Sequence, residues 1–210
     1  MTKKQRVEKI VNALNEYYPE AICALKAEKP HELLIAVRLS AQCTDKRVNT
    51  VTPALFERFP TVESFASADT SEIEKYIRSC GLYKTKAKSI KEMCTVLLEK
   101  YGGQVPNTME ELLTLPGIGR KTANLIMGDL FGMKGAVVVD THFARLTKRM
   151  GLTEATDPAA IEFELRKLLD ENESLGFCHR IINLGRELCP ATGKPKCDIC
   201  PVAEYCKKNY

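Results

Sequence analysis

The chain has 210 residues, of which 44% are hydrophobic and 28% are charged, and its formal net charge is +4. This composition is typical of a globular protein that is long enough to bury one or two cores. No apolar run approaches the roughly 18 residues of a membrane span, and the N-terminal segment MTKKQRVEKIV has no apolar signal-peptide core. We therefore expect a cytoplasmic protein with no membrane partner, whose mild positive charge permits a polyanionic ligand without requiring one.

Hydrophobic residues recur at helical spacing through almost the whole chain. The clearest amphipathic segments lie at residues 7–14, 33–41, 87–101, 125–130 and 161–169. Asp157-Pro158 is a typical helix start, and Gly102-Gly103 is a typical helix end. The β-branched run at Ala136–Val139 is too short to build a sheet. The pattern predicts an all-α fold of about ten helices, with a hinge at Gly132–Gly135.

The segment LPGIGRKTA, Leu115–Ala123, predicts a glycine hairpin between two helices. Pro116 starts a turn, Gly117 and Gly119 permit backbone angles that other residues avoid, and Ile118 can point inward as an anchor. Backbone N–H groups that converge at a helix N-terminus form a ready anion site. The hairpin, with Leu115 before it and Arg120 after it, therefore favours contact with a nucleic-acid backbone. The alternative is a tight helix–helix turn with no ligand.

Lys121 follows Arg120, so both cations should lie in the first turn of the helix that TANLIMGDLF begins. The positive end of the helix dipole makes each such cation unfavourable by about 0.3–1 kcal/mol. This position and partial burial would disfavour the protonated form of Lys121. An unprotonated amine is a nucleophile that can form a Schiff base. The alternative role for Lys121 is a simple phosphate contact.

Asp140 ends an apolar run in GAVVVDTHFARL and precedes another amphipathic helix. The commonest role of an aspartate at such a place is to cap the helix. The carboxylate could also stabilise positive charge on a sugar or move a proton beside Lys121. Taken alone, the pattern favours the cap.

Four of the nine cysteines crowd into the last 22 residues with the spacing C-x7-C-x2-C-x5-C. Structural zinc sites usually pair two short knuckles across a longer spacer, whereas this segment has a single C-x-x-C. The compact set favours a [4Fe–4S] cluster held by four thiolates, with zinc as the alternative. The proposed ligands are Cys189, Cys197, Cys200 and Cys206. Lys194 and Lys196 in the same loop suit phosphate contacts, although a solvated charged surface would look the same.

Together these motifs resemble the endonuclease III family of DNA base-excision glycosylases. The resemblance rests on LPGIGRKTAN, VDTH and the terminal four-cysteine loop, in that order. It extends to His31–Asp45, HELLIAVRLSAQCTD, and to Gly81–Ile90, GLYKTKAKSI. It covers nearly the whole chain. The gap between Cys189 and Cys197 is one residue longer than is usual in that family, and a bulge in the loop should absorb the extra residue.

The resemblance implies the roles of individual residues. Lys121 matches the catalytic lysine and Asp140 the catalytic aspartate, while the four cysteines match the cluster ligands. Gln42 matches a glutamine that fills the gap left by a flipped base, and Leu82 matches a leucine that wedges toward the opposite strand. Asp45 matches an acidic residue that lines the pocket.

The resemblance also implies a two-domain helix–hairpin–helix fold with a C-terminal iron–sulfur loop. Residues 22–133 would form a six-helix domain, and residues 1–21 would pack with 134–210 and the cluster, with the active site in the cleft between the domains. The expected protein is a monomer that binds double-stranded DNA containing a damaged pyrimidine or an abasic site. It would excise oxidised pyrimidines through a lysine Schiff base and then cut the strand by β-elimination.

Three other functions fit parts of the pattern. A related adenine glycosylase would lack the lysine and carry a glutamate near Ala36 and Val37. A thymine-mismatch glycosylase with this lysine would be unusual. A non-catalytic DNA-damage binder would use the same motifs without cutting the strand.

Overall fold

The computed structural model describes residues 1–209, which form eleven α-helices and one 3₁₀ turn, with no β-strand among them. The prediction of an all-α fold is confirmed. The helices are α1 (Lys3–Tyr17), α2 (Pro30–Ser40), α3 (Asp45–Arg58), α4 (Val62–Ser67), α5 (Thr70–Ile77), α6 (Tyr83–Tyr101), α7 (Met109–Leu112), α8 (Arg120–Asp129), α9 (Thr141–Arg149), α10 (Pro158–Arg166) and α11 (Ser174–Glu187), and the 3₁₀ turn η1 is Cys197–Ile199. None of the helices in residues 1–209 is both long and apolar enough to span a bilayer.

The described chain divides into two compact units. The inserted unit is Cys23–Phe131 and contains α2 to α8. The terminal unit combines Met1–Ile22 with the chain from Gly132 onward. The second boundary falls at the predicted glycine hinge, where Gly132 and Gly135 have positive φ angles of 65° and 72°. The assignment of 22–133, and of 1–21 with 134–210, as folding domains stays a prediction.

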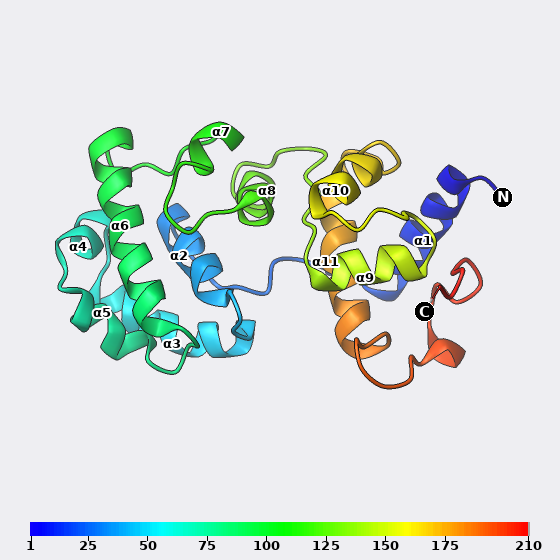
Figure 1. The fold of residues 1–210 in the computed structure, drawn as a ribbon, viewed down its shortest axis with the longest axis horizontal. Helices are drawn as coiled ribbons and strands as arrows, with labels where there is room; N and C mark the ends of the chain where they lie inside the picture. Colours follow the sequence, from blue (N-terminus) through cyan, green and yellow to red (C-terminus); the bar gives the residue numbers. More distant parts are fainter. Residues whose placement is uncertain (210) are drawn as a thin grey trace. The chain divides into compact units, whose positions relative to one another are not determined.

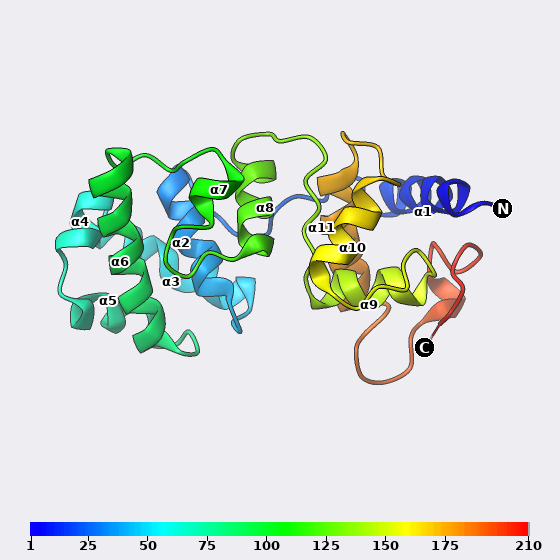
Figure 2. The same cartoon turned by 45° about the horizontal axis from the view of Figure 1, so that its top comes forward.

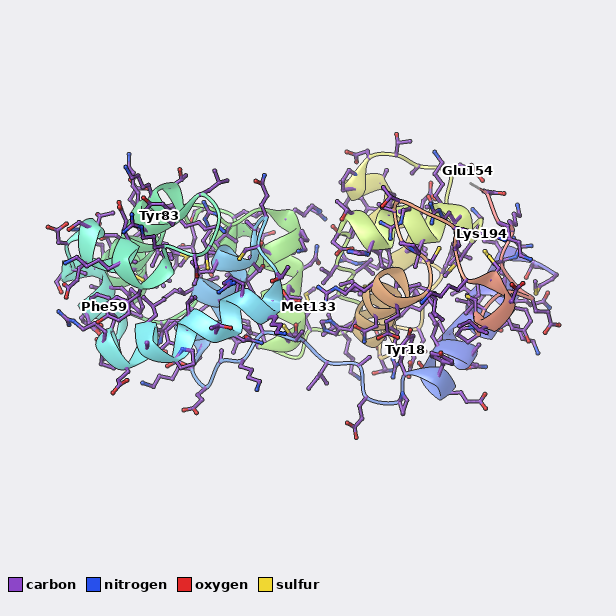
Figure 3. The ribbon with its side chains drawn as sticks, turned by 90° about the horizontal axis from the view of Figure 1, so that it is seen from below. Tyr18, Phe59, Tyr83, Met133, Glu154 and Lys194 are labelled. Atoms are coloured by element: carbon purple, nitrogen blue, oxygen red, sulfur yellow. The ribbon has the colours of Figure 1, made fainter. Side chains whose placement is uncertain are left out.

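The inserted unit packs around the long helix α6, which α4 and α5 flank (Figure 1). Helix α2 contacts both α6 and α8, and every side chain from Leu33 to Val37 is buried. Phe59, which Figure 3 labels, packs against Phe65 and Tyr76 with ring centroids 5.1 and 5.9 Å apart. This core supports the loop that follows α2 and the loop that precedes α6.

The terminal unit is organised around α11, which contacts α1 on one side and α9 on another (Figure 2). Gly185 permits the close approach of α9, because a Cβ at that position would lie 2.6 Å from Nδ1 of His142. Two hydrogen bonds hold α1 against α11. Asn15 donates a 3.0 Å bond to Glu173, the N-cap of α11. Arg180 of α11 donates a 3.0 Å bond to the carbonyl of Tyr18, the C-cap of α1. The N-terminal helix is thus an integral part of this core.

Most of the predicted helices appear where the spacing placed them. Helix α1 buries Val7, Ile10, Val11 and Leu14 as its pattern predicts, and Asp157 caps α10 through a 2.9 Å bond from the amide of Ala160. Ala41 was wrongly grouped with the apolar face of α2, because the helix ends at Ser40 and Ala41 is exposed. The chain leaves the helix there to form a turn that belongs to the candidate site.

Candidate functional site

The segment Leu115–Arg120 forms the predicted hairpin between α7 and α8. Leu115 and Ile118 are 2% and 7% exposed, so both side chains anchor the loop in the core of the inserted unit. Gly117 has φ +80°, and a Cβ there would lie 2.9 Å from Cδ of Arg38. Both the left-handed backbone and the close packing on Arg38 require glycine at this position.

The backbone amides of the hairpin are divided between internal and outward roles. Ile118 N–H donates to the carbonyl of Leu115 at 3.1 Å, so it is used inside the turn. In the described part of the chain, the amides of Gly117, Gly119 and Lys121 donate to no other group. Unpaired N–H groups at a helix start need water or an anion as a partner. The amide of Ile118 is therefore not available to an anion. Ile118 supports the hairpin through its buried side chain instead.

Gly119 is the N-cap of α8, with φ −105° and ψ 176°. These angles are open to any residue, so the expectation that Gly119 needs special backbone freedom is wrong. A Cβ at Gly119 would meet nothing within 4 Å in the described part of the chain. Neither backbone angle nor internal packing explains this glycine. Its lack of a side chain leaves room for another molecule to approach the backbone.

Lys121 is the second residue of α8, and Arg120 is the first, as predicted. The first turn holds no acidic residue, so no carboxylate of that turn offsets the positive end of the dipole. The expected partial burial of Lys121 is wrong, because its side chain is exposed. The buried residues of α8, among them Ala123 and Ile126, do not include Lys121. Lys121 is thus accessible to a large ligand.

Asp140 is the N-cap of α9 and belongs to the terminal unit, whereas Lys121 belongs to the inserted unit. Its Oδ1 atom accepts a 2.7 Å hydrogen bond from the amide of Phe143. The carboxylate is half-buried, directly after the buried apolar run Ala136–Val139, which forms no helix. The cap uses Oδ1 and leaves Oδ2 outside that bond, so capping does not occupy the whole carboxylate.

His142 lies two residues beyond Asp140, and its protonation state follows from its contacts. Nη2 of Arg145 lies 3.2 Å from Nδ1 of His142. An arginine can only donate, so Nδ1 must accept, which requires the unprotonated form at that nitrogen. Burial also lowers the pKa of His142. Around Asp140 the imidazole is therefore neutral near neutral pH.

Gln42 and Leu82 share a rare backbone conformation. Their φ angles are 53° and 58°, in the left-handed region that side-chain-bearing residues avoid at a cost of about 1–2 kcal/mol. Gln42 follows Ala41 in a turn closed by a 3.0 Å bond from Cys43 N–H to the carbonyl of Ser40. Leu82 is the N-cap of α6.

The loops that carry these two residues meet. A Cβ at Gly81 would lie 3.4 Å from the carbonyl oxygen of Gln42. Gln42 is exposed, and Leu82 is 59% exposed although it is a large apolar residue. Asp45 begins α3 just beyond the same turn and is half-buried. The structure thus brings Gln42 and Leu82 to one exposed edge, each in a strained conformation of the kind that clusters at functional sites.

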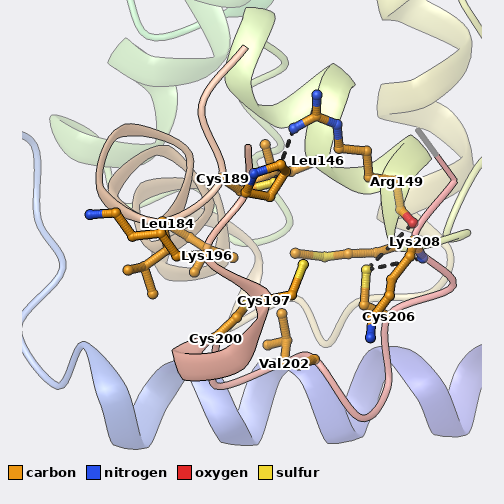
Figure 4. A pocket seen from close by; sticks show the side chains of 14 residues that line it. Leu146, Arg149, Leu184, Cys189, Lys196, Cys197, Cys200, Val202, Cys206 and Lys208 are labelled. Carbon is orange, nitrogen blue, oxygen red and sulfur yellow. Dashed lines mark hydrogen bonds between the residues drawn. The ribbon is translucent and has the colours of Figure 1, made fainter. Parts of the chain in front are cut away.

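The four C-terminal cysteines line one pocket of the terminal unit (Figure 4). Apolar side chains form much of the remaining wall, among them Leu146, Met150, Leu184, Leu188 and Val202. Among residues 1–209, no three His, Cys, Asp or Glu side chains are arranged to hold a single metal ion. The sulfurs therefore surround the pocket without converging on one point.

Donor groups surround these sulfurs. Nη1 of Arg149 donates to Sγ of Cys189 at 3.1 Å, and Lys208 N–H donates to Sγ of Cys206 at 3.3 Å (Figure 4). Burial raises the pKa of the Cys200 and Cys206 thiols, so these groups ionise readily only when a metal replaces the proton. Four cysteines, N–H donors to sulfur and an apolar wall fit a polynuclear iron–sulfur group.

Lys194 and Lys196 are exposed in the loop that precedes η1 (Figure 3 marks Lys194). Gly193, with φ +88°, lies directly before them, and Lys196 N–H donates to the carbonyl of Leu188 at 2.8 Å. The loop is thus ordered by its backbone, and both ammonium groups remain available for a solution partner.

Sequence reasoning missed three residues that support the site. Lys86 is completely buried, and Ser89 is 8% exposed. Arg38 donates a 2.8 Å hydrogen bond from Nε to Oγ of Ser89. The same arginine packs against Gly117 of the hairpin. A signal for Lys86 was present, because it lies on the same helical face as Ile90, Met93 and Leu97. A lysine in phase with a buried apolar stripe is unusual.

Comparisons with known proteins agree with the motifs. The family model of HhH-GPD superfamily base excision DNA repair proteins matches residues 35–171, well over half of the chain. The iron–sulfur binding domain of endonuclease III matches residues 193–206. The chain therefore carries an iron–sulfur domain, and its cofactor is a [4Fe–4S] cluster, which confirms that prediction.

Full-length relatives extend this likeness. The chain is 48% identical to endonuclease III of Synechocystis sp. (strain ATCC 27184 / PCC 6803 / Kazusa) over 98% of this chain and 93% of that protein. A solved non-covalent complex of endonuclease III with DNA is 41% identical and superposes with a TM-score of 0.93, covering 99% of this chain and 97% of the other. A trapped covalent endonuclease III–DNA intermediate, an estranged-adenine complex, has 41% identity and a TM-score of 0.92 over the same shares. The chain belongs to the endonuclease III family, enzymes that combine DNA glycosylase and abasic-site lyase activity within the HhH-GPD superfamily of base excision DNA repair proteins.

Proposed function

We propose that the chain excises oxidised pyrimidines from double-stranded DNA and then cuts the abasic strand, using Lys121 as nucleophile and Asp140 as its partner. It would act as a DNA-associated monomer in the cytoplasm. The observation that carries this proposal is the position of Lys121, exposed at the second residue of α8, directly after a hairpin with unpaired amides. A phosphate bound by those amides would bring the adjoining nucleotide to the same helix end.

The reaction begins when the damaged nucleotide rotates out of the stack, which costs a few kcal/mol and least for a poorly paired base. The Nζ lone pair of Lys121 attacks C1′ of the deoxyribose, and the C1′–N bond to the base breaks as the base leaves with a proton. Ring opening gives an imine between Lys121 and C1′. Loss of a proton from C2′ then expels the 3′ phosphate by β-elimination, and hydrolysis of the imine releases the enzyme.

Asp140 supports this reaction through the oxygen that the cap leaves outside its bond. A carboxylate near C1′ stabilises the positive charge that develops on the sugar as the base departs, and it can accept the proton that Lys121 must lose. The N-cap bond to Phe143 holds the carboxylate in one orientation. The cap and the catalytic role are therefore compatible, since each uses a different oxygen.

Gln42 and Leu82 would occupy the space that the flipped nucleotide leaves. Both are exposed on adjoining loops, and their left-handed backbones hold the side chains at the edge of the inserted unit. Asp45, three residues beyond Gln42, would line the base pocket. Leu115, Gly117, Ile118, Gly119 and Arg120 would form the phosphate clamp, with Leu115 and Ile118 as its anchors.

Cys189, Cys197, Cys200 and Cys206 would hold the cluster in the pocket that they line. When bound, the cluster links four points of the loop through iron–sulfur bonds and can carry an electron. Lys194 and Lys196 would contact DNA phosphates from the same loop. The longer spacing between Cys189 and Cys197 falls in this exposed segment, where Gly193 supplies a left-handed turn.

Borohydride trapping tests the proposed chemistry directly. Borohydride reduces an imine to a stable amine, so the wild-type protein incubated with duplex DNA containing thymine glycol should yield a covalent complex on a denaturing gel. Lys121→Gln should abolish it, whereas Arg120→Gln, which removes a cation of the clamp but not the nucleophile, should weaken DNA binding and still give the complex at saturating DNA. Trapping that persists in Lys121→Gln would assign the nucleophile elsewhere, and no trapping by wild type on damaged or abasic DNA would favour a non-catalytic binder.

A further inference from the structure

Lys86 is a buried lysine with no role in the reaction above. It lies in the first turns of α6, its side chain is completely buried, and Nζ donates a 2.8 Å hydrogen bond to the carbonyl of Leu39. The titratable groups that face it are Cys43, Cys80 and Arg38, and burial lowers the pKa of Lys86. Lysines are almost never fully buried unless a specific contact requires them.

The position of Lys86 joins the two strained loops. Its backbone amide donates a 3.0 Å bond to the carbonyl of Leu82, the left-handed N-cap of α6. Its side chain reaches the carbonyl of Leu39 in the last turn of α2, immediately before the turn that holds Gln42. Lys86 therefore contacts the backbone in both segments that lead to the exposed edge, at Leu82 before α6 and at Leu39 near the end of α2.

The contact with Leu39 suits a cation. The last carbonyls of a helix have no partner within the helix and carry its partial negative charge. An ammonium group at this end therefore supplies both a hydrogen-bond donor and a compensating positive charge. Ser89 continues the network, since its Oγ donates to the carbonyl of Lys86 at 3.2 Å and accepts from Nε of Arg38 at 2.8 Å. Arg38 in turn packs under Gly117 of the hairpin. Lys86 is thus linked through its side chain to the end of α2 and through its backbone carbonyl to Ser89 and Arg38, which underlie the hairpin.

We propose that Lys86 is a positioning residue that holds Gln42 and Leu82 in register for insertion into the DNA stack. The inference rests on the proposed function, because it assumes that these two side chains fill the space of the extruded nucleotide. Left-handed backbones at two non-glycine residues persist only where the surrounding structure enforces them. The Nζ bond of Lys86 to the carbonyl of Leu39 supplies that constraint, because it ties the start of α6, just after Leu82, to the end of α2, just before Gln42.

Lys91 provides a matched control. It lies on the same helix, and its Nζ donates a hydrogen bond of the same length, 2.8 Å, to the carbonyl of Ala68. That contact joins α6 to the segment between α4 and α5, whereas the contact of Lys86 joins α6 to α2. Lys86→Met and Lys91→Met each remove one lysine–carbonyl bond and leave an unbranched apolar side chain that is one atom shorter. The two variants therefore separate a loss of local stability from a loss of loop position.

The test compares two rates in each variant: base excision from duplex DNA with a paired thymine glycol, and strand cutting at a preformed abasic site. Only the first requires a base to be extruded and replaced. We expect Lys86→Met to slow excision about tenfold relative to strand cutting. A change of this size is typical when one contact that orients a reacting group is lost. Lys91→Met should leave the ratio of the two rates unchanged. Gln42→Ala should shift the ratio in the same direction as Lys86→Met.

The outcomes are distinct. Equal loss of both rates in Lys86→Met, or an equal change of the ratio in Lys91→Met, would overturn the positioning role and leave Lys86 as a general stability element. If Lys86→Met does not fold, Lys86→Gln, which keeps a shorter N–H donor, undergoes the same comparison with the same criterion. Failure of the proposed function shows separately, because wild type would then lack excision on the paired lesion or Gln42→Ala would leave the ratio unchanged.

Discussion

Oδ1 of Asp140 accepts a 2.7 Å hydrogen bond from the amide of Phe143, so the proposed catalytic carboxylate is also a helix cap. Asparagine and alanine substitutions separate these two roles. Asparagine caps a helix about as well as aspartate, so Asp140→Asn should keep the melting temperature close to wild type while excision falls by about 100-fold or more, because general acid–base groups contribute rate factors of that size. Asp140→Ala should lose the same activity and also about 1 kcal/mol of unfolding free energy.

Thermal melts and single-turnover excision rates measure the two effects. A fully active Asp140→Asn would show that the carboxylate serves only as the cap. The asparagine variant should also retain DNA affinity within about twofold, since the substitution removes no phosphate contact.

Gly117 and Gly119 predict opposite consequences for two neighbouring substitutions. Gly117→Ala should cost about 1–2 kcal/mol of stability, because alanine is strained at φ +80° and its Cβ would meet Arg38. Gly119→Ser should keep or raise stability, because serine is a better helix N-cap and meets no neighbour there. The added side chain should instead weaken binding of undamaged duplex DNA by about tenfold. Fluorescence anisotropy and thermal melts distinguish these effects, and unchanged affinity in Gly119→Ser would exclude the hairpin as the phosphate clamp.

The left-handed backbone at Gln42 predicts a trade between stability and activity. Gln42→Gly should raise the free energy of unfolding by about 1 kcal/mol, because glycine adopts φ 53° without strain. The same variant should excise a paired lesion at least about tenfold more slowly, because nothing fills the vacated space. Gln42→Ala serves as the control, since it removes the side chain and keeps the strain. A glycine variant that is both less stable and fully active would contradict this assignment.

The neutral state of His142 predicts how stability depends on pH. Its pKa is lowered in the folded protein, so below the unfolded value of about 6.5 the unfolded chain binds the proton first. Its contribution to stability is therefore present above that value and is lost as the pH falls below it. His142→Asn, whose amide oxygen can accept from Arg145 without titrating, should flatten the decline in melting temperature over this range. An identical pH profile in the two proteins would show that His142 does not titrate there.

Loss of one cysteine ligand should affect the C-terminal loop selectively. Residues 189–206 contain only the 3₁₀ turn η1 as regular secondary structure, so few backbone bonds hold this segment without the cluster. The wild-type protein should be yellow-brown, with broad absorption near roughly 400 nm. Cys200→Ser should bleach that colour and speed hydrogen exchange in residues 189–209, whereas Cys23→Ser, outside the pocket, should do neither. A coloured Cys200→Ser with unchanged exchange would remove Cys200 from the ligand set.

The sequence predicted the fold where local patterns and packing agree. Helix α1 follows its i, i+3, i+4 spacing, α10 starts at Asp157-Pro158, and α6 ends at Tyr101 with Gly102 as its C-cap, because in each case the local signal and the buried face coincide. The glycine loop and the cations after it were also predictable, since glycine spacing and charge are visible in the sequence itself.

Other features of the site depend on tertiary context that no local pattern records. The left-handed angles of Gln42 and Leu82 arise because neighbouring helices fix both ends of each loop, and neither residue type predicts that conformation. Gly119 was assigned the wrong reason, because sequence alone does not distinguish a glycine required by its angle from one required by space. Lys86 was missed because charged residues are expected at the surface, although its phase with Ile90 indicated the core.

The inserted unit interrupts the terminal unit after Ile22, and this topology constrains the order of assembly during translation. Helix α1 leaves the ribosome before the inserted unit, but its partner α11 begins only at Ser174. The chain from Cys23 to Phe131 can complete its own core while α1 still has no surface to cover. The apolar stripe of α1 is thus exposed in the nascent chain until the inserted unit and α11 have both been synthesised. A chaperone or a collapsed intermediate would have to shield that stripe in the interval.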